Sequence, residues 1–144
     1  MDNDDESLRK PYRCTVSLRL RHPSMSADKI SAALNLKPRN AWDADDPRPR
    51  SRPGTHWSCR ISEDPDAELE DILHAGVESL EPHKAFLQEF VETGGWAAYF
   101  IGYFTTDISG GPTLDCELLK RLGDLHLNLE FDVYGNRGYG DSPA

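Results

Sequence analysis

A strict alternation of apolar and polar residues near the start of the chain limits what this sequence can fold into. Its apolar members are Tyr12, Cys14, Val16, Leu18 and Leu20, and its polar members are Arg13, Thr15, Ser17, Arg19 and Arg21. Because successive side chains of a β-strand point to opposite faces, this period of two predicts a strand with one buried and one exposed face. The rest of the chain must then supply a second layer to cover the buried face.

Three later segments have the pattern of strands. Thr55 to Ser62 resumes the alternation, and Leu127 to Tyr134 ends the chain's regular pattern in the same way. Trp96 to Thr106 is apolar at both odd and even positions, so we expect it to be a central strand. Between the first two strands, the prolines and arginines of Asn40 to Gly54 predict an irregular, exposed loop.

The segments between these strands have apolar residues at the spacing of helices. Ser26 is a good N-cap for a helix that ends before Pro38. A second apolar stripe follows Asp64-Pro65, and Pro82 divides it into two helices that end at Gly94-Gly95. Leu114 to Leu125 gives the last amphipathic helix.

This order of elements predicts an α+β fold. We expect a single mixed or antiparallel sheet of four to five strands with helices packed on one face, loosely ferredoxin-like. The strand–helix–strand order recurs in both halves, which suggests a weak β-α-β duplication. The expected boundaries are a disordered leader over residues 1–10, one α+β domain over 11–135, and a disordered tail over 136–144.

The beginning of the chain and its cysteines bear on where the protein resides. The first residues are acidic and precede no apolar segment, unlike a signal peptide. No run approaches the roughly 18 apolar residues that span a bilayer, so we expect no membrane contact. Cys14, Cys59 and Cys116 are isolated, which indicates reduced thiols and a cytoplasmic location.

The charge of the chain argues against some partners. A net charge of −9 and a pI near 4.9 disfavour nucleic acid and suit either simple solubility or a basic protein partner. The five histidines show no HxH or HExxH spacing, and there is no CxxC pair. We therefore predict no metal site and no cofactor, and the sequence shows no catalytic motif.

Several short segments along the chain carry a resemblance to a known family. They are Ser17-Leu18-Arg19-Leu20, His22-Pro23-Ser24, Ile30-Ser31 before Leu34, Trp57, Thr113-Leu114, and Leu129 through Asp132-Val133-Tyr134. These segments resemble those of a small bacterial family, domain-of-unknown-function family 4279. The resemblance would span Tyr12 to Tyr134, and the family implies this fold without implying an activity.

If helices cover one face of the sheet, the polar alternates should line the other, and we take that face as the candidate binding site. Arginines, tyrosines and carboxylates that converge on one surface are typical of a ligand or partner site. The alternative is a solvated face whose arginines pair with carboxylates across strands. Asp132 and Tyr134 are the strongest candidates, because the resemblance reaches them. The candidate binding residues are Arg13, Arg19, Arg21, His56, Arg60, Tyr99, Tyr103, Asp132 and Tyr134.

Three functions follow as hypotheses, and the sequence favours a protein that is not an enzyme. The first is an interaction module of the immunity type that binds a basic toxin. The second is a sensor that binds a small ligand on the open sheet face. The third is a small enzyme that uses Asp132 or Glu130 with a histidine such as His56.

Two chains could also pair through an exposed edge strand. The first strand and the last strand are the candidates for such a homodimer contact.

Overall fold

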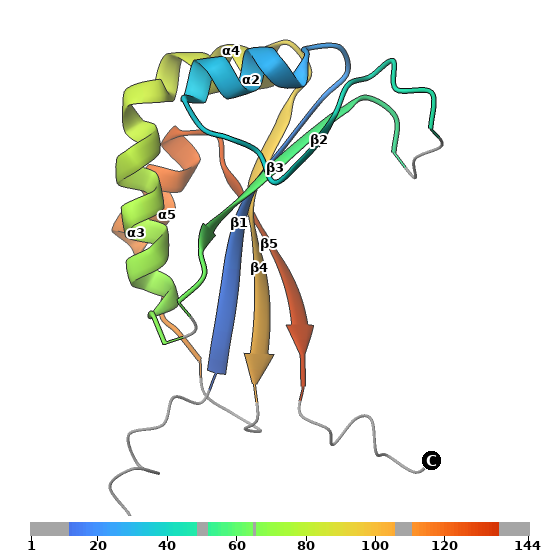
Figure 1. Cartoon of the computed structure of the whole chain (residues 1–144). Helices are drawn as coiled ribbons and strands as arrows, with labels where there is room; N and C mark the ends of the chain where they lie inside the picture. The colour runs from blue at the N-terminus through green and yellow to red at the C-terminus, as the bar shows by residue number, and fades with distance from the viewer. Residues whose placement is uncertain (1–11, 49–51, 65, 106–110, 136–144) are drawn as a thin grey trace, which may run out of the picture.

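The computed structural model describes residues 12–48, 52–64, 66–105 and 111–135. Its strands are β1 (Tyr12–His22), β2 (Asn40–Trp42), β3 (Thr55–Ser62), β4 (Trp96–Thr105) and β5 (Asn128–Tyr134). They form a five-stranded sheet in the order β2-β3-β1-β4-β5. Neighbours pair antiparallel except β4 and β5, which are parallel, so the predicted α+β fold with one mixed sheet is confirmed (Figure 1). The predicted leader (1–10) and tail (136–144) lie outside the described residues.

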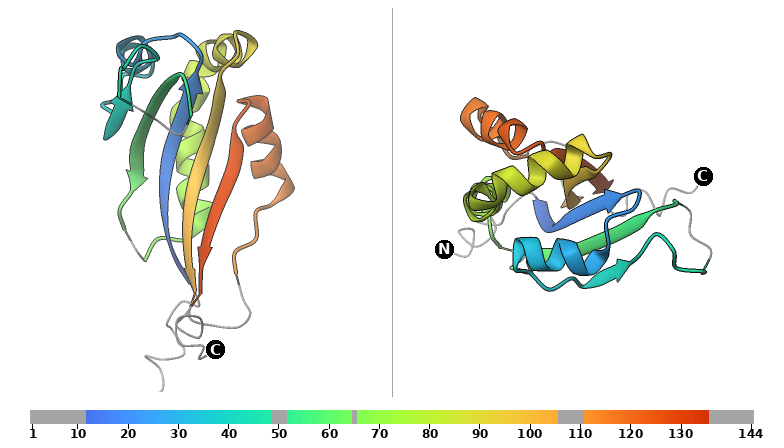
Figure 2. Two further views of the ribbon diagram at one scale, coloured as in Figure 1. Left: turned by 90° about the vertical axis from the view of Figure 1, so that its right-hand side faces the viewer. Right: turned by 90° about the horizontal axis from the view of Figure 1, so that it is seen from above.

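The helices are α2 (Ala27–Leu34), α3 (Leu69–Leu80), α4 (Lys84–Glu92) and α5 (Cys116–Asp124), with a 3₁₀ turn, η1, at Glu81–His83. Figure 2 shows α3 and α5 behind the long strands, and α2 and α4 near the end where β1 leads into α2. Their buried side chains join those of the sheet in one core. The open side of the sheet therefore stays free for polar residues.

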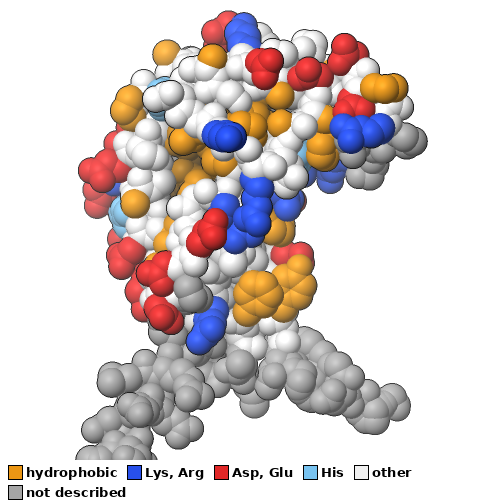
Figure 3. Space-filling model, viewed as in Figure 1, with side chains coloured by type: hydrophobic (Ala, Val, Ile, Leu, Met, Phe, Trp, Pro, Cys, Tyr) orange, Lys and Arg blue, Asp and Glu red, His pale blue; other side chains and the backbone are white. Residues whose placement is uncertain are grey.

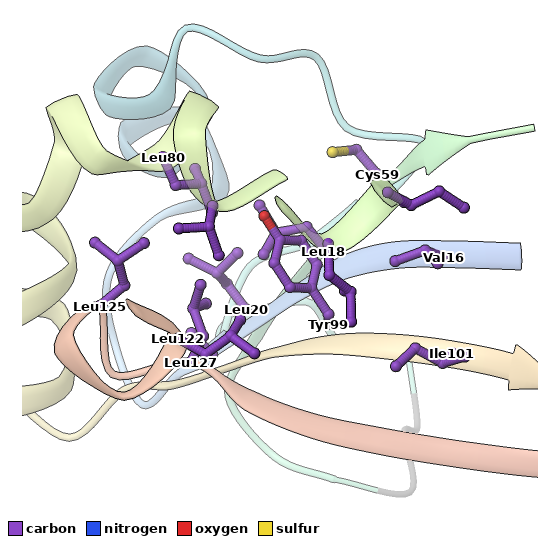
Figure 4. Packing of buried hydrophobic residues seen from close by; sticks show 14 of the residues in the cluster. Val16, Leu18, Leu20, Cys59, Leu80, Tyr99, Ile101, Leu122, Leu125 and Leu127 are labelled. Atoms are coloured by element: carbon purple, nitrogen blue, oxygen red, sulfur yellow. The ribbon is translucent and has the colours of Figure 1, made fainter. Parts of the chain in front are cut away.

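The core explains why β1 alternates. Its burial alternates along the whole strand, and register places Leu18 beside Cys59 of β3 and Tyr99 of β4. Leu20 of β1 and Leu127, just before β5, meet Leu80, Leu122 and Leu125 of the helical layer (Figure 4). Leu18 and Leu20 are almost fully buried, which stabilises the fold by about 1.5–3 kcal/mol per side chain.

Local sequence signals set most helix ends. The Ser26 side chain caps α2 by accepting a hydrogen bond from the Lys29 backbone N–H at 3.1 Å. Pro82 falls in η1, which separates α3 from α4 as predicted. Gly94 ends the helical pair with φ of +106°, a conformation that glycine adopts without strain.

Two local predictions are wrong. The segment after Asn40 was expected to be irregular throughout, but Asn40–Trp42 forms β2 against β3. The second helical stripe begins at Leu69 rather than directly after Asp64, because the Asp64 side chain accepts the Asp66 backbone N–H in a local turn. At β2 the pairing with a neighbouring strand overrides the local signals of a loop, and after Asp64 a short-range hydrogen bond overrides the helical pattern.

The two halves of the chain pair their strands differently. In the second half, β4, α5 and β5 form a parallel unit. In the first half, α2 leads from β1 to β2, and β3 lies between these two strands in the sheet. The repeated order of elements therefore does not give a repeated arrangement.

The sheet edges are β2 and β5. β1 lies in the middle, so the expectation that it could offer an edge to a second copy is wrong. On β5, Phe131 and Val133 point to the helical side but are 45% and 61% exposed. Of the two predicted strands, β5 alone has the position that edge pairing requires.

Candidate functional site

The open face of the sheet is organised in rows, because cross-strand register brings side chains from different strands side by side. One row contains Trp42, His56, Arg21 and Trp96, contributed in turn by β2, β3, β1 and β4. The Trp42 and His56 rings stack with centroids 4.4 Å apart. The guanidinium carbon of Arg21 lies 4.4 Å from the centroid of the Trp96 ring. This row is thus a line of planar groups across four strands.

A second row, four residues nearer the N-terminus of β1, holds charges of both signs. Register places Arg60 of β3 next to Ser17 of β1, Ser17 next to Phe100 of β4, and Phe100 next to Glu130 of β5. Arg19 lies between the two rows, beside Ser58. The small side chains of Ser17 and Ser58 leave room between the arginines.

Arg19 contacts both an aromatic residue and a carboxylate of the second row. Its guanidinium carbon lies 3.7 Å from the centroid of the Phe100 ring, and its Nη1 lies 3.6 Å from Glu130 Oε1. Both side chains are about one-third exposed, at 30% and 36%. A partly exposed pair at this distance contributes little to stability, so its main effect is to orient Arg19.

Polar atoms on this face remain unsatisfied. The Nε of Arg60 and the Oε1 of Glu130 are buried, and neither has a hydrogen-bond partner among the described residues. Among the described residues, the ion pair on the open face is the one between Arg19 and Glu130. Burial lowers the pKa of Arg21, and the nearby charges of Arg52 and Arg19 lower it further, while Glu130 opposes them. The face therefore holds more positive charge than it neutralises.

β2 and the start of β3 form an arm that projects over the arginines of the open face. A pocket of about 130 Å³ lies under the arm, and its walls include Arg21, Trp42, Arg52, Thr55 and His56. Figure 3 shows basic side chains gathered in the hollow beneath the arm. Of the predicted candidates, Arg21 and His56 line this pocket, and Arg19 and Arg60 lie on the same face of the sheet.

The other end of the open face is separate from this hollow. Arg13 pairs in register with Phe104, and Phe104 with Tyr134. The Phe104 and Tyr134 rings stack at 4.9 Å, and the Tyr134 hydroxyl donates to Asp132 Oδ2 at 2.5 Å. That hydrogen bond raises the pKa of Tyr134. The two residues with the strongest prediction therefore bind each other on an exposed surface.

The prediction that Tyr99 and Tyr103 line the open face is wrong. Tyr99 is 1% exposed in the core, and burial raises its pKa. Tyr103 stacks on Tyr12 with centroids 5.0 Å apart, on the same helical side. Because β4 is apolar at both odd and even positions, its pattern did not show which face points outward. The aromatic residues that β4 places on the open face are Trp96, Phe100 and Phe104.

The geometry does not join a histidine to the carboxylates. His56 pairs with Arg21, and Asp132 lies beside Gly102, whose partner is Thr15. Arg21 and Thr15 are six residues apart along β1, a separation of about 20 Å at roughly 3.3 Å per residue. No group of three or more histidine, cysteine, aspartate or glutamate residues in the described ranges could hold a metal ion. No helix among the described residues has the length and apolar character to cross a membrane.

Negative charge collects away from the open face. Between Glu63 and Glu92 the sequence has ten acidic residues, and Lys84 is the single lysine or arginine. This stretch contains α3, η1 and α4, which lie on the helical side of the sheet. The two sides of the sheet therefore carry opposite charge.

Comparison with protein families gives one match. Residues 12–136 match the family described as "Domain of unknown function (DUF4279)". The searches of curated proteins and of solved structures gave no match.

Proposed function

Because the chain belongs to the domain-of-unknown-function family DUF4279, whose description states no activity, we propose its function from the geometry of the open face. The protein is a binding module that takes a small anionic ligand in the hollow under the β2–β3 arm. The ligand class is a compound with a carboxylate or phosphate group. The observation that carries the proposal is that Arg19, Arg21 and Arg60 lie on one face of the sheet, beside the hollow that Arg21 lines, with Glu130 as the nearby carboxylate.

The spacing of the arginines suits one anion. Arg19 lies between the other two arginines. Arg21 is two residues away on β1, about 7 Å along the strand, and Arg60 of β3 is level with Ser17, about 7 Å along and about 5 Å across from Arg19. Guanidinium groups at these separations can reach a common carboxylate or phosphate and donate paired hydrogen bonds to it.

The aromatic rings support the same conclusion. Phe100 and Trp96 lie against Arg19 and Arg21 and restrict where each guanidinium points. A site whose donors are held in place before binding loses less conformational entropy when the ligand arrives. The stacked pair of Trp42 and His56 offers an additional planar wall to a ligand with a ring.

The main alternative is a solvated face held together by cross-strand ion pairs. That interpretation needs a carboxylate for each arginine. Asp132, however, accepts a hydrogen bond from Tyr134, and Glu130 lies near Arg19. An enzyme that uses His56 with Asp132 needs those groups together, and they stand at opposite ends of the face. A basic toxin as partner fits the acidic helical side better than the open face.

Thermal unfolding tests the proposal. We expect phosphate, citrate or a nucleoside monophosphate to raise the unfolding temperature at constant ionic strength, with chloride as the reference. A ligand at about a hundred times its Kd stabilises the folded state by about 2.7 kcal/mol. The absence of stabilisation by every anion in the panel would contradict the proposal.

Matched variants locate the site. Arg21→Gln and Arg60→Gln should each abolish most of the stabilisation. Lys37→Gln removes the same charge from an exposed side chain in the connection between α2 and β2, and it should retain the full effect. An equal loss in all three variants would indicate nonspecific attraction to the charge of the whole molecule.

A further inference from the structure

We propose that the groove between the end of β3 and α3 binds an extended, basic peptide segment of a protein partner. The groove has a volume of about 400 Å³ and lies on the helical side of the sheet. Ile61 and Ile72 provide apolar surface, while Asp64 and Asp71 provide negative charge. This site is distinct from the arginine hollow and does not depend on the function proposed for it.

The edge of β3 beside this groove is incompletely paired. β2 covers β3 from His56 to Ser58, where the Ser58 carbonyl accepts the Arg39 backbone N–H at 2.7 Å. Beyond Ser58, β3 has no strand neighbour on that side among the described residues. Backbone groups alternate between the two edges of a strand, so the peptide group of Arg60 faces the same open edge as that of Ser58.

Small residues on α3 keep the groove open. Ala75, Gly76 and Ser79 line it, and Gly76 lies so close to the sheet that an added Cβ would stand 2.6 Å from the Tyr99 hydroxyl. Ala75 and Ser79 are exposed. A strand added to the edge of β3 would thus run alongside a helix surface with few bulky side chains, as in peptide recognition by strand addition.

The charge of the surroundings selects the occupant. The stretch from Glu63 to Glu92 carries ten acidic residues against Lys84. Asp64 and Asp71 are in the walls of the groove itself. A segment with lysine or arginine at alternate positions would meet this charge, and its intervening apolar side chains would contact Ile61 and Ile72. An acidic segment would be repelled.

The end of β3 contains a β-bulge. Arg60 and Ser62 pair with the adjacent residues Ser17 and Val16 of β1, so β3 has one extra residue between them. The extra residue is Ile61, so regular pairing is offered only as far as Arg60. The peptide is therefore held by few backbone hydrogen bonds, and side-chain contacts with the groove supply much of its affinity.

Fluorescence polarisation tests this inference on the full chain. The probe is a fluorescein-labelled peptide of alternating lysine and valine, and the reference is one of alternating glutamate and valine. We expect the basic peptide to bind and the acidic peptide not to. A basic peptide with N-methyl groups at alternate amides should bind more weakly, because it cannot donate to the edge of β3. Equal binding of the methylated peptide, or no binding of the basic one, would overturn the proposal.

Substitutions in the groove provide the second test. Ala75→Trp should lower the affinity by roughly tenfold, because the indole fills a central part of the interface. Ala85→Trp places the same side chain on an exposed position of α4 outside the groove and should leave the affinity unchanged. Asp71→Asn should lower the affinity up to about fivefold, with Glu92→Gln as its control. Equal effects of Ala75→Trp and Ala85→Trp would place the peptide elsewhere.

Discussion

The guanidinium of Arg19 lies against the ring of Phe100, with 3.7 Å between the guanidinium carbon and the ring centroid. The two residues come from neighbouring antiparallel strands and sit diagonally, since Phe100 is the register partner of Ser17. Arg19 is therefore held over an apolar ring on one side and near Glu130 on the other. The contact fixes an arginine that would otherwise sample many rotamers in solvent.

The first prediction concerns the energy of this contact. In a double-mutant cycle of Arg19→Met and Phe100→Leu, we expect a coupling of about 0.5–1 kcal/mol in the free energy of unfolding. Urea unfolding of the four proteins measures it. A coupling indistinguishable from zero would mean that the ring only happens to lie beneath the guanidinium.

The second prediction concerns the unsatisfied guanidinium. Arg60→Met should raise the free energy of unfolding of the ligand-free protein by up to about 1 kcal/mol, because it removes a buried donor without a partner. The same substitution should abolish stabilisation by anions. Arg121→Met is the contrasting variant, since Arg121 bonds to Glu81 at 3.0 Å through two nitrogens. Its loss should lower stability slightly, because an exposed ion pair contributes little. A clear destabilisation by Arg60→Met would show that this guanidinium has a structural partner.

The third prediction concerns pH. His22 Nδ1 accepts the backbone N–H groups of Ser24 and Met25 at 3.1 and 2.9 Å, and its Nε2 lies 2.8 Å from Thr93 Oγ1. Burial, helped by the charge of Lys29, lowers the pKa of His22 below its ordinary value of 6.5. Between the two pKa values the unfolded chain binds more protons, so stability increases with pH in that window. The contribution of His22 is thus complete above pH 6.5 and is lost as the pH falls towards the folded-state pKa.

Two variants isolate this effect. His22→Gln should lower the free energy of unfolding by about 1–3 kcal/mol at neutral pH, and the difference from the parent protein should shrink on acidification. His83→Gln makes the same change of side chain on a partly exposed turn and serves as the control. Urea unfolding across this pH range measures both. A difference that stays constant with pH would show that His22 does not titrate in this way.

The fourth prediction compares two glycines. An added Cβ at Gly95 would stand 2.5 Å from the Phe90 carbonyl oxygen, whereas one at Gly123 in α5 meets nothing within 4 Å. Gly95→Ala should therefore lower stability by about 1–3 kcal/mol. Gly123→Ala should raise it by about 0.5–1 kcal/mol through helix propensity. Thermal unfolding measures both changes, and an equal effect of the two substitutions would contradict the packing around Gly95.

The parts of the fold that sequence could predict are those with an unambiguous period. Alternation from Tyr12 to Arg21 correctly assigned each side chain of β1 to a face, and the same holds for Thr55 to Ile61. Ser62 departs from it, because the extra residue at Ile61 places Ser62 beside Val16 on the helical side. The same rule did not show which face of β4 is buried, because Tyr99 and Phe100 are both large and apolar. Its orientation depends on the pairing of Leu18 with Tyr99, which is a property of the assembled sheet.

Of the candidate site, the arginines and His56 could be predicted from the sequence. Arg19, Arg21 and Arg60 follow from alternation on two strands, and His56 follows from the same rule. Trp96 and Phe100 were missed as open-face residues, although their spacing of four along a strand places them on one side. The position of Arg52 depends on how the β2–β3 arm folds over the sheet, for which the sequence has no periodic signal.

Arginines on one side of the sheet and carboxylates on the other make this molecule a permanent electric dipole. A dipolar molecule turns in the field of a charged surface before contact, so this chain approaches a polyanion with its open face and a polycation with α3 foremost. Two copies, each with a net charge of −9, repel each other, so the dipole acts on charged partners and not on self-association. Salt at a physiological concentration screens this orienting effect beyond about 8 Å.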